Sequence, residues 1–157
     1  TGVTGQWDIS DQGYAIIRQF EGFEAKAYKD TGGVWTIGFG TIKYPDGTRV
    51  REGDTCTREQ AEAWLKSDSK WVDACLDKYV KVKVTQNQFD AIASFVYNIG
   101  ETQFTKSTFL TLLNQGNFTG AAGQFDRWIF DNGKRIQGLV NRRASEKVLF
   151  LKAMRTK

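Results

Sequence analysis

The sequence predicts an α+β fold that is mostly helical and carries one small antiparallel sheet near its N-terminus. Over residues 25–50, glycines are dense and β-branched or aromatic residues alternate with polar ones, a pattern typical of short strands joined by turns. The segments that follow carry apolar residues at helical spacing behind capping residues. At 157 residues, the chain suits one compact domain with a substantial core.

The N-terminal part contains one predicted helix and then the sheet. Ser10 is a favourable N-cap, and Gly22 is expected to end the helix. The apolar face of this helix consists of Tyr14, Ile16, Ile17 and Phe20. Within the sheet region, residues 44–48 read Tyr-Pro-Asp-Gly-Thr, which indicates a tight turn between strands. Residues 1–9 are expected to be a tail or linker.

Two capping boxes open the next helices. Thr57 with Gln60 and Thr85 with Gln88 have the spacing at which each side chain caps the other's backbone amide. The first apolar run is expected to continue as one long helix to about residue 79. The second is expected to be buried on most sides and to end at Gly100. Further helices are expected over 107–116, 119–129 and 139–154, with a polar turn over 131–134.

The composition narrows the chemistry. Apolar residues make up 40% of the chain and charged residues 25%, and histidine is absent. The lack of histidine excludes Ser-His and Cys-His catalysis and the usual zinc sites. In one continuous helix Cys56 and Cys75 would lie about 28 Å apart, so we expect two free thiols. A disulfide would require a helix break near 67–69. No metal site is expected, because two cysteines without histidine supply too few ligands. No apolar run approaches the roughly 20 residues that a bilayer crossing needs.

Two carboxyls and a hydroxyl stand out near the N-terminus. Glu21 ends the first predicted helix, while Asp30 and Thr36 fall in the strand-and-turn segment behind it. Two carboxyls with a water-sized gap are what acid/base cleavage of a glycosidic bond requires. The structural alternatives are an ion pair of Glu21 with Arg18 or Lys26, a turn role for Asp30 and simple strand propensity for Thr36. The helix dipole disfavours a glutamate at a C-terminal helix end, which favours the functional interpretation.

These residues belong to three blocks that resemble the bacteriophage lysozymes (endolysins). The first block holds Glu21-Gly22, Ala27-Tyr28-x-Asp30 and the Trp-Thr-Ile-Gly-Phe-Gly run over 35–40. The second covers 85–91 and 95–100, and the third covers 138–146. The resemblance extends over about residues 10–152. One departure is Thr41, where the family usually has histidine; we expect altered local stability there rather than lost activity.

The resemblance implies a lysozyme-like, two-lobed fold. Residues 10–157 would form the lysozyme domain, with a small sheet-bearing lobe over about 10–56, a connecting helix over 57–80 and a helical lobe over 81–157. The cleft between the lobes would bind the glycan. The implied reaction is hydrolysis of the β-1,4 bond between N-acetylmuramic acid and N-acetylglucosamine in peptidoglycan, which causes cell lysis.

The family's residue roles carry over by position. Glu21 would be the general acid, and partial burial can keep its carboxyl protonated. Asp30 would stay ionised and, with Thr36, hold the attacking water. This is an inverting arrangement, in which the carboxyls stand roughly 6.5–9.5 Å apart. The resemblance places Ile42, Tyr97, Asn98 and Ser107 at substrate-binding positions.

Arg142 matches a family arginine that approaches the catalytic glutamate, and no cofactor or metal is implied. Core packing is the alternative for Ile42 and Tyr97, and a solvated helix face is the alternative for Arg142. Two of the five tryptophans, Trp64 and Trp128, have the spacing of buried helix positions, so aromatic content alone does not argue for glycan binding.

Charge points to an anionic partner. The net charge is +4 and the pI is about 9.1. Cations are dense at the C-terminal end: Arg142, Arg143, Lys147, Lys152, Arg155 and Lys157. We therefore expect attraction to the anionic bacterial envelope, while nucleic acid is disfavoured because no nucleic-acid-binding motif is present. A membrane-active C-terminal helix is an alternative, since Val148, Leu149, Leu151 and Met154 oppose the cations; the family resemblance buries that face instead.

The protein is expected to act as a monomer. It would be made in the cytoplasm of an infected host and act on the cell wall. Two rival functions remain. A lytic transglycosylase would cut the same bond without water, and a catalytically dead module would only bind the wall. The intact Glu21, Asp30 and Thr36 argue against both.

Overall fold

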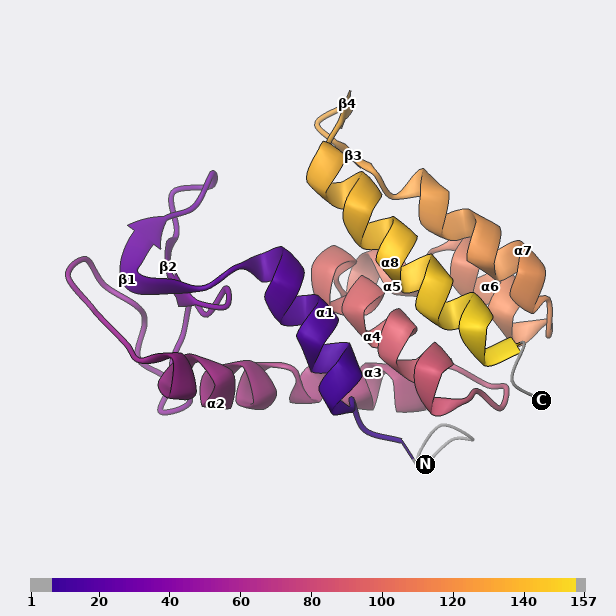
Figure 1. The fold of residues 1–157 in the computed structure, drawn as a ribbon, viewed down its shortest axis with the longest axis horizontal. Coiled ribbons are helices and arrows are strands. Elements are labelled where there is room, and N and C mark those ends of the chain that lie inside the picture. The colour runs from indigo at the N-terminus through magenta and orange to yellow at the C-terminus, as the bar shows by residue number, and fades with distance from the viewer. Residues whose placement is uncertain (1–6, 155–157) are drawn as a thin grey trace. The chain divides into compact units, whose positions relative to one another are not determined.

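The structure is a computed structural model that describes residues 7–154, with side chains described up to residue 152. Its elements are α1 (Asp11–Glu21), β1 (Glu24–Lys29), β2 (Trp35–Gly38), α2 (Arg58–Asp68), α3 (Lys70–Tyr79), α4 (Gln86–Ile99), α5 (Glu101–Thr105), α6 (Thr108–Asn114), α7 (Phe118–Gln124), the 3₁₀ helix η1 (Phe125–Arg127), β3 (Phe130–Asp131), β4 (Lys134–Arg135) and α8 (Gln137–Met154) (Figure 1). The predicted mostly helical α+β class is confirmed.

The chain divides into two compact units. The small unit is Arg18–Trp71, and the described residues of the helical unit are 7–17 and 72–154. The division falls inside α1 and inside α3. Glu21, Asp30 and Thr36 therefore belong to one unit, and the geometry around each can be described within it.

The small unit is built on the predicted antiparallel sheet. β1 pairs with β2, with Tyr28 opposite Thr36 and a register irregularity between Glu24 and Tyr28. Ala27 of β1, Ile37 of β2 and Val50 form a small buried core, and Trp35, Tyr44, Cys56 and Trp64 pack against it. The turn predicted over 44–48 is present: the Gly47 amide donates to the Tyr44 carbonyl at 2.9 Å.

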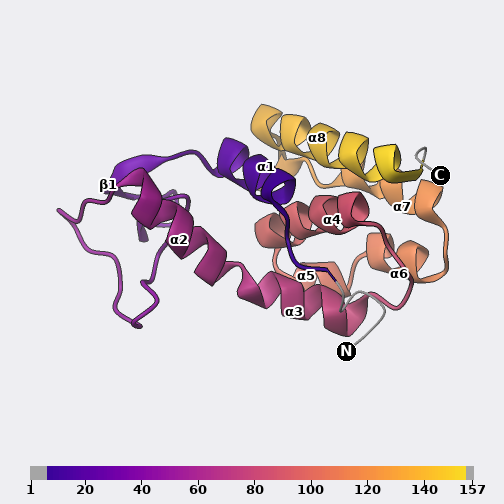
Figure 2. The same cartoon turned by 60° about the horizontal axis from the view of Figure 1, so that its bottom comes forward.

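The single helix expected over 57–80 is wrong, because the structure has two helices there. The Thr57–Gln60 capping box forms as predicted, but α2 ends at Asp68 and α3 begins at Lys70 (Figure 2). Between them Ser69 has φ −88° and ψ 1°, and its hydroxyl donates to the Lys66 carbonyl at 3.2 Å. Short polar side chains compete with helical backbone hydrogen bonds in this way. Cys56 and Cys75 are both free thiols, as expected.

Thr41, the position that departs from the family pattern, is buried in the small unit. Its backbone exchanges two 2.8 Å hydrogen bonds with Ile37, and its hydroxyl donates to Asp68 Oδ2 at 3.0 Å. Burial raises the pKa of Asp68, although the Thr41 hydrogen bond opposes the rise. Asp68 is also the last residue of α2, where the helix dipole disfavours negative charge.

We expect Asp68→Asn to stabilise the protein at pH 7. Because the folded pKa of Asp68 is raised above its unfolded value, folding penalises the ionised carboxylate. Stability is therefore lost as pH rises through this pKa and regained below it. The amide keeps an acceptor for Thr41 and removes the charge, so the gain should be on the order of 1 kcal/mol at pH 7 and shrink toward pH 3. Thermal unfolding across that range measures it; a variant less stable than the parent at pH 7 would contradict it.

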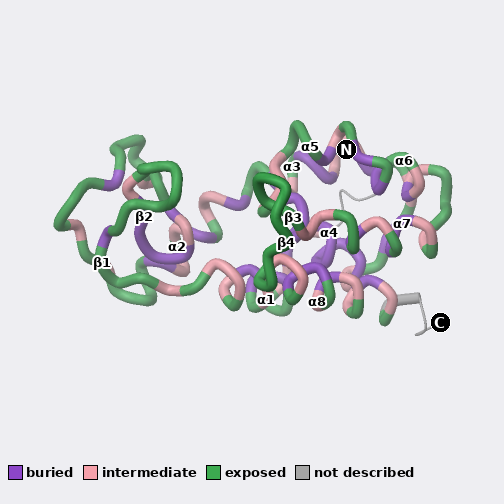
Figure 3. The backbone as a smooth tube through the Cα atoms, turned by 90° about the horizontal axis from the view of Figure 1, so that it is seen from above, coloured by how far each residue is buried: buried purple, intermediate pink, exposed green. Residues whose placement is uncertain are grey.

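The helical unit is organised around α4 and α8, which pack against each other (Figures 1 and 2). The Thr85–Gln88 capping box forms, Gly100 is the C-cap of α4, and nine of the fourteen residues of this helix, 88–96, are buried, as predicted. Along α8, buried positions alternate with exposed ones (Figure 3). Four fully buried rings hold the inner faces of α4, α6, η1 and α8 together: Phe95, Phe109, Phe125 and Phe150.

Ser10 and the first turn of α1 are attached to α4 through a buried carboxylate. Asp90, with 0% exposure, accepts the Ser10 amide at 2.9 Å, the Ser10 hydroxyl and the side-chain amides of Gln12 and Gln86, each at 2.9 Å. Ser10 does precede α1, but its hydroxyl donates to Asp90. The expected tail over 1–9 is wrong for residues 7–9, since Ile9 is buried and the Trp7 indole donates to a backbone carbonyl; residues 1–6 lie outside the described part.

Several short elements escape the sequence prediction. The helix expected over 107–116 is α6, and that over 119–129 is α7 followed by η1. The five-residue α5 was not expected, nor was a second sheet. The turn predicted over 131–134 closes a hairpin of β3 and β4, in which Asn132 (φ 52°) and Gly133 (φ 78°) take the left-handed conformations that a tight hairpin turn needs. The prediction of a single sheet is therefore wrong.

Candidate active site

Glu21 is the last residue of α1. The chain turns away at once, because Gly22 adopts φ 75° and its amide donates to the Arg18 carbonyl at 3.0 Å. The Glu21 side chain is half-buried and lies against Gly40. A Cβ atom at Gly40 would stand 3.0 Å from Glu21 Oε1, and Gly40 has φ 89°. The glycine thus lets the backbone approach this carboxylate closely. Arg18 has an ion pair with Glu62, at 3.9 Å.

Asp30 and Thr36 are joined through a single residue, Val34. Asp30 Oδ1 accepts the Val34 amide at 2.9 Å and the Gly32 amide at 2.9 Å. The Val34 carbonyl accepts both the Asp30 amide, at 2.9 Å, and the Thr36 hydroxyl, at 2.9 Å. Asp30 is therefore a turn residue, as the structural alternative proposed, and the turn also fixes where its carboxylate stands relative to Thr36.

The hydrogen bonds at this turn decide what the two side chains can still do. Both bonds to the Asp30 carboxylate end on Oδ1, which leaves Oδ2 for another donor. The single proton of the Thr36 hydroxyl is given to Val34, so its oxygen can only accept from a further partner. Asp30 Oδ2 and Thr36 Oγ1 are therefore both acceptors for the hydrogens of a bound water molecule.

Tyr28 interacts with the candidate carboxyls, although the sequence reasoning gave it no role. It lies opposite Thr36 across the sheet. Burial raises the pKa of its hydroxyl, and the negative charges of Glu24, Glu21 and Asp30 raise it further. The Tyr28 hydroxyl thus interacts electrostatically with both candidate carboxyls, Glu21 and Asp30. Its position on β1, two residues before Asp30, is the signal that could have identified it.

The other predicted site residues differ in accessibility. Ile42 is 42% exposed, so core packing is wrong as its explanation. In the helical unit, Tyr97 is half-buried and Asn98 is exposed near the end of α4. Ser107 is a buried N-cap of α6: its hydroxyl accepts the Leu110 amide at 3.1 Å and donates to a backbone carbonyl at 2.7 Å. The sequence did not predict this capping role.

Arg142 is buried, which makes the solvated helix face wrong as its explanation. Only 3% of the residue is exposed; its Nη2 donates to the Ser94 carbonyl at 3.0 Å, and its Nε donates to Glu146 Oε2 at 3.3 Å. The neighbouring Arg143 is also buried; its Nε lies 2.8 Å from Glu146 Oε1 and its guanidinium carbon lies 5.0 Å from the centre of the Phe95 ring. Glu146 therefore holds two cations inside the helical unit.

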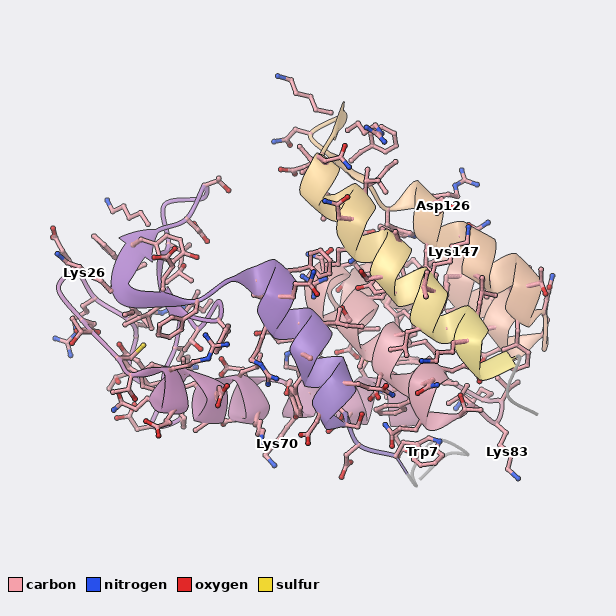
Figure 4. All side chains as sticks on the ribbon, in the orientation of Figure 1. Trp7, Lys26, Lys70, Lys83, Asp126 and Lys147 are labelled. Carbon is pink, nitrogen blue, oxygen red and sulfur yellow. The ribbon has the colours of Figure 1, made fainter. Side chains whose placement is uncertain are left out.

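The basic C-terminal surface is smaller than the sequence count implied. Arg142 and Arg143 point inward, and Arg155 and Lys157 lie outside the described residues. Lys147 does reach the surface, where it pairs with Asp126 at 2.8 Å (Figure 4). The expected burial of the apolar face of this helix is wrong for Val148, which is 67% exposed; Leu149 and Leu151 are half-buried, and the Met154 side chain is outside the description.

Other chemistries find little support in the described residues. Burial raises the pKa of the Cys56 thiol and raises that of Cys75 to about 11, so both stay in the weakly nucleophilic thiol form near neutral pH. Over the described part of the chain, no three His, Cys, Asp or Glu side chains gather in a way that could hold a metal ion. None of the described helices has both the length and the apolar character that a membrane crossing requires.

Comparison with known proteins agrees with the geometry. Residues 18–146 match the phage lysozyme family. An endolysin of Acyrthosiphon pisum secondary endosymbiont phage 1 is 45% identical over 146 residues, which cover 90% of this chain and 97% of that protein. Two solved structures are similar to this one. The endolysin from Escherichia coli O157:H7 phage FAHEc1 has a TM-score of 0.86 at 41% identity, covering 96% of this chain and 98% of the other.

The second is the muramidase domain of SpmX from Asticaccaulis excentricus, with a TM-score of 0.83 at 38% identity, covering 92% of this chain and 97% of that domain. These similarities confirm the lysozyme-like fold that the sequence motifs implied. The family match spans most of this chain, and the matched residues include Glu21, Asp30 and Thr36. This chain therefore belongs to the phage lysozyme family.

Proposed function

We propose that this protein is an endolysin that hydrolyses the β-1,4 bond between N-acetylmuramic acid and N-acetylglucosamine in bacterial peptidoglycan. One observation carries the proposal: the Val34 backbone ties the Asp30 carboxylate and the Thr36 hydroxyl into one turn, in the same unit as the half-buried Glu21. The enzyme is a glycoside hydrolase, as its family and its endolysin and muramidase relatives indicate.

In the proposed mechanism Glu21 donates its proton to the leaving glycosidic oxygen. Positive charge develops on the ring of the sugar that is left, and the Asp30 carboxylate stabilises it. Water held by Asp30 Oδ2 and Thr36 Oγ1 attacks the anomeric carbon on the opposite face and gives up its proton to Asp30. This sequence inverts the anomeric configuration. Arg142 is proposed to support Glu21, and Ile42, Tyr97, Asn98 and Ser107 to border the bound glycan, as the family resemblance implies.

The stereochemistry of the product tests the two water-holding residues together. We expect the first-formed reducing sugar to be the α anomer. Thr36→Val should lower the hydrolysis rate by at least about tenfold, because the water loses one of its two acceptors. Proton NMR of a defined peptidoglycan fragment, recorded before mutarotation, measures the anomer, and a turbidity assay on bacterial walls measures the rate.

Other results in these experiments would identify a different reaction or no reaction. Initial β product together with an active Thr36→Val variant would replace the inverting mechanism with a retaining one, in which Asp30 is the nucleophile. A product lighter by one water in mass spectrometry would identify a lytic transglycosylase. Walls that bind the protein but are not cleaved would identify a non-catalytic binding module.

We also propose where the enzyme works. It would be made in the cytoplasm of the infected host, reach the cell wall and act there as a monomer. Its net charge of +4 supports attraction to the anionic envelope, and no nucleic-acid partner is proposed.

A further inference from the structure

The small unit contains a cavity that shares no residue with the proposed catalytic group. Its volume is about 530 Å³, which lies within the range of small-ligand sites. The residues that carry the argument come from the 44–48 turn, the segment that follows it and α2: Tyr44, Arg49, Arg51, Asp54, Gln60 and Trp64.

One wall of this cavity is aromatic and held in place. The rings of Tyr44 and Trp64 are 4.9 Å apart at 55°, and both pack against the core of the small unit. The Tyr44 hydroxyl donates to Asp54 Oδ2 at 2.6 Å. Burial and this hydrogen bond raise the pKa of Tyr44 to about 12, so the hydroxyl keeps its proton at any working pH. The wall is therefore already formed before a ligand arrives.

The rim of the cavity carries two exposed guanidinium groups, and that of Arg51 lies close enough to Asp54 for its charge to add to the Tyr44 hydrogen bond in lowering the pKa of that carboxyl. Arg49 and Arg51 are exposed, and within the described part of the chain neither guanidinium has a hydrogen bond or an ion pair. The two carboxylates in the same lining are hydrogen-bonded, and these bonds lower the pKa of both, so each keeps its negative charge. Asp54 accepts the Tyr44 hydroxyl and the Arg51 amide, the latter at 3.0 Å, and Asp46 accepts the Thr48 amide and hydroxyl.

Exposed arginines are usually just solvated, so the cations alone would mean little. Here, however, they border a rigid aromatic wall. Guanidinium groups bind carboxylates through paired, charge-assisted hydrogen bonds, and the apolar face of a pyranose ring packs on aromatic side chains. A ligand that fits both features carries a sugar ring and a carboxylate a few ångströms apart.

We propose that this cavity binds a second muramyl unit of peptidoglycan, with a carboxylate on Arg49 and Arg51 and the sugar ring against Trp64. The proposal rests on the proposed function, since it assumes that the wall polymer is the substrate. The carboxylate has two sources: the lactyl group of a muramic acid without peptide, or the stem peptide attached to that group. A second contact with the same polymer would raise the effective concentration of the enzyme on insoluble walls without taking part in bond cleavage.

Direct binding tests the site in the full-length Glu21→Gln protein, so that the ligand is not turned over. The ligands are a N-acetylglucosamine–N-acetylmuramic acid disaccharide with a free lactyl carboxylate, the same disaccharide carrying a tetrapeptide, and its lactyl amide. The indole N–H signal of Trp64, assigned with Trp64→Phe, is followed by NMR. We expect this signal to shift with the free carboxylate or with the tetrapeptide form, whichever supplies the anion, and not with the lactyl amide.

The arginine pair provides the decisive variant, because both side chains are exposed and their loss should leave the fold intact. We expect Arg49→Gln with Arg51→Gln to weaken the binding seen at Trp64 by about tenfold. Lys70→Gln with Lys83→Gln removes two exposed cations elsewhere (Figure 4). This control should leave the affinity measured at Trp64 unchanged. In the active enzyme, the arginine pair variant should raise KM on insoluble walls while leaving kcat on a short soluble glycan unchanged.

The possible failures are distinguishable. Three outcomes would each overturn the second site, even if the wild-type enzyme lyses walls. The Trp64 indole signal does not shift with either carboxylate ligand, it shifts equally with the lactyl amide, or the arginine variant binds as tightly as its parent. Absence of wall lysis by the wild-type enzyme would instead overturn the proposed function.

Discussion

Glu21→Gln should lose nearly all wall-lysing activity while keeping its fold. The amide is nearly isosteric with the acid but has no proton to give to the leaving oxygen. Loss of general acid catalysis lowers rates by about 10²–10⁴-fold, equivalent to about 3–5 kcal/mol of transition-state stabilisation. The rate is measured by the loss of turbidity of a bacterial wall suspension, and folding is measured by circular dichroism and thermal unfolding.

A neighbouring carboxyl supplies the matched control. Glu24 lies on β1, three positions beyond Glu21, and is exposed. Glu24→Gln makes the same change in charge and shape, and should retain activity within about twofold of the parent, since a surface charge of this kind is largely screened. If Glu21→Gln kept more than about a tenth of the wild-type rate, or if both variants lost activity equally, Glu21 would not be the general acid.

The largest expected loss of stability comes from Glu146→Ala. Glu146 has 0% exposure and accepts the Ser94 hydroxyl at 2.6 Å in addition to its contacts with Arg142 and Arg143. Removing the carboxylate would leave two buried guanidinium groups without their shared anion. Breaking a buried ion pair from one side costs about 3–5 kcal/mol, which should lower Tm by about 10 °C or more for a chain of this size.

Burial makes this cluster costly even in the native protein. Burial raises the pKa of Glu146 despite both arginines and lowers the pKa of Arg143. The Arg143 Nε and Glu146 Oε1 atoms form an ion pair at 2.8 Å, but they are poorly aligned for a hydrogen bond. Arg143 Nη2 and Arg142 Nε do donate to Glu146 Oε2, at 3.1 Å and 3.3 Å, and these bonds add to the attraction of the charges in a medium of low dielectric constant.

Lys147→Ala is the control for Glu146→Ala, because it removes the next residue of the same helix. Lys147 and Asp126 form their ion pair at the surface (Figure 4), where such pairs contribute about 0–1 kcal/mol. Thermal or denaturant unfolding of the two variants should separate them clearly. Similar losses in both would mean that the buried cluster does not stabilise the helical unit.

Local chemistry explains which parts of the fold were predictable. The capping boxes at Thr57 and Thr85 form as predicted because their hydrogen bonds span only three residues. The break at Ser69 was considered only as the condition for a disulfide, because neither glycine nor proline marks it. The short α5 and the two-residue strands β3 and β4 carry too few residues for any periodicity to show.

The candidate site likewise has parts that local sequence predicts and parts that depend on distant contacts. Glu21, Asp30 and Thr36 were predicted from spacing and family motifs. The burial of Arg142 was not, because the residue sequence shows a cationic helix end and gives no sign that Ser94, from α4, and Glu146 surround it. The cavity beside Tyr44 and Trp64 was likewise hidden, since its lining depends on how the 44–48 turn folds against α2.

The turn around Val34 has a consequence for the durability of Asp30 and Thr36 as the proposed water-holding pair. Every hydrogen bond described between Asp30, Val34 and Thr36 closes within seven consecutive residues, so the loop entropy to be overcome is small and no distant segment has to arrive first. The orientation of these two side chains thus depends largely on local contacts, with Thr36 also held in the sheet opposite Tyr28. Mutations that weaken the helical unit should then reduce the lifetime of the enzyme at high temperature before they alter the stereochemistry of the product.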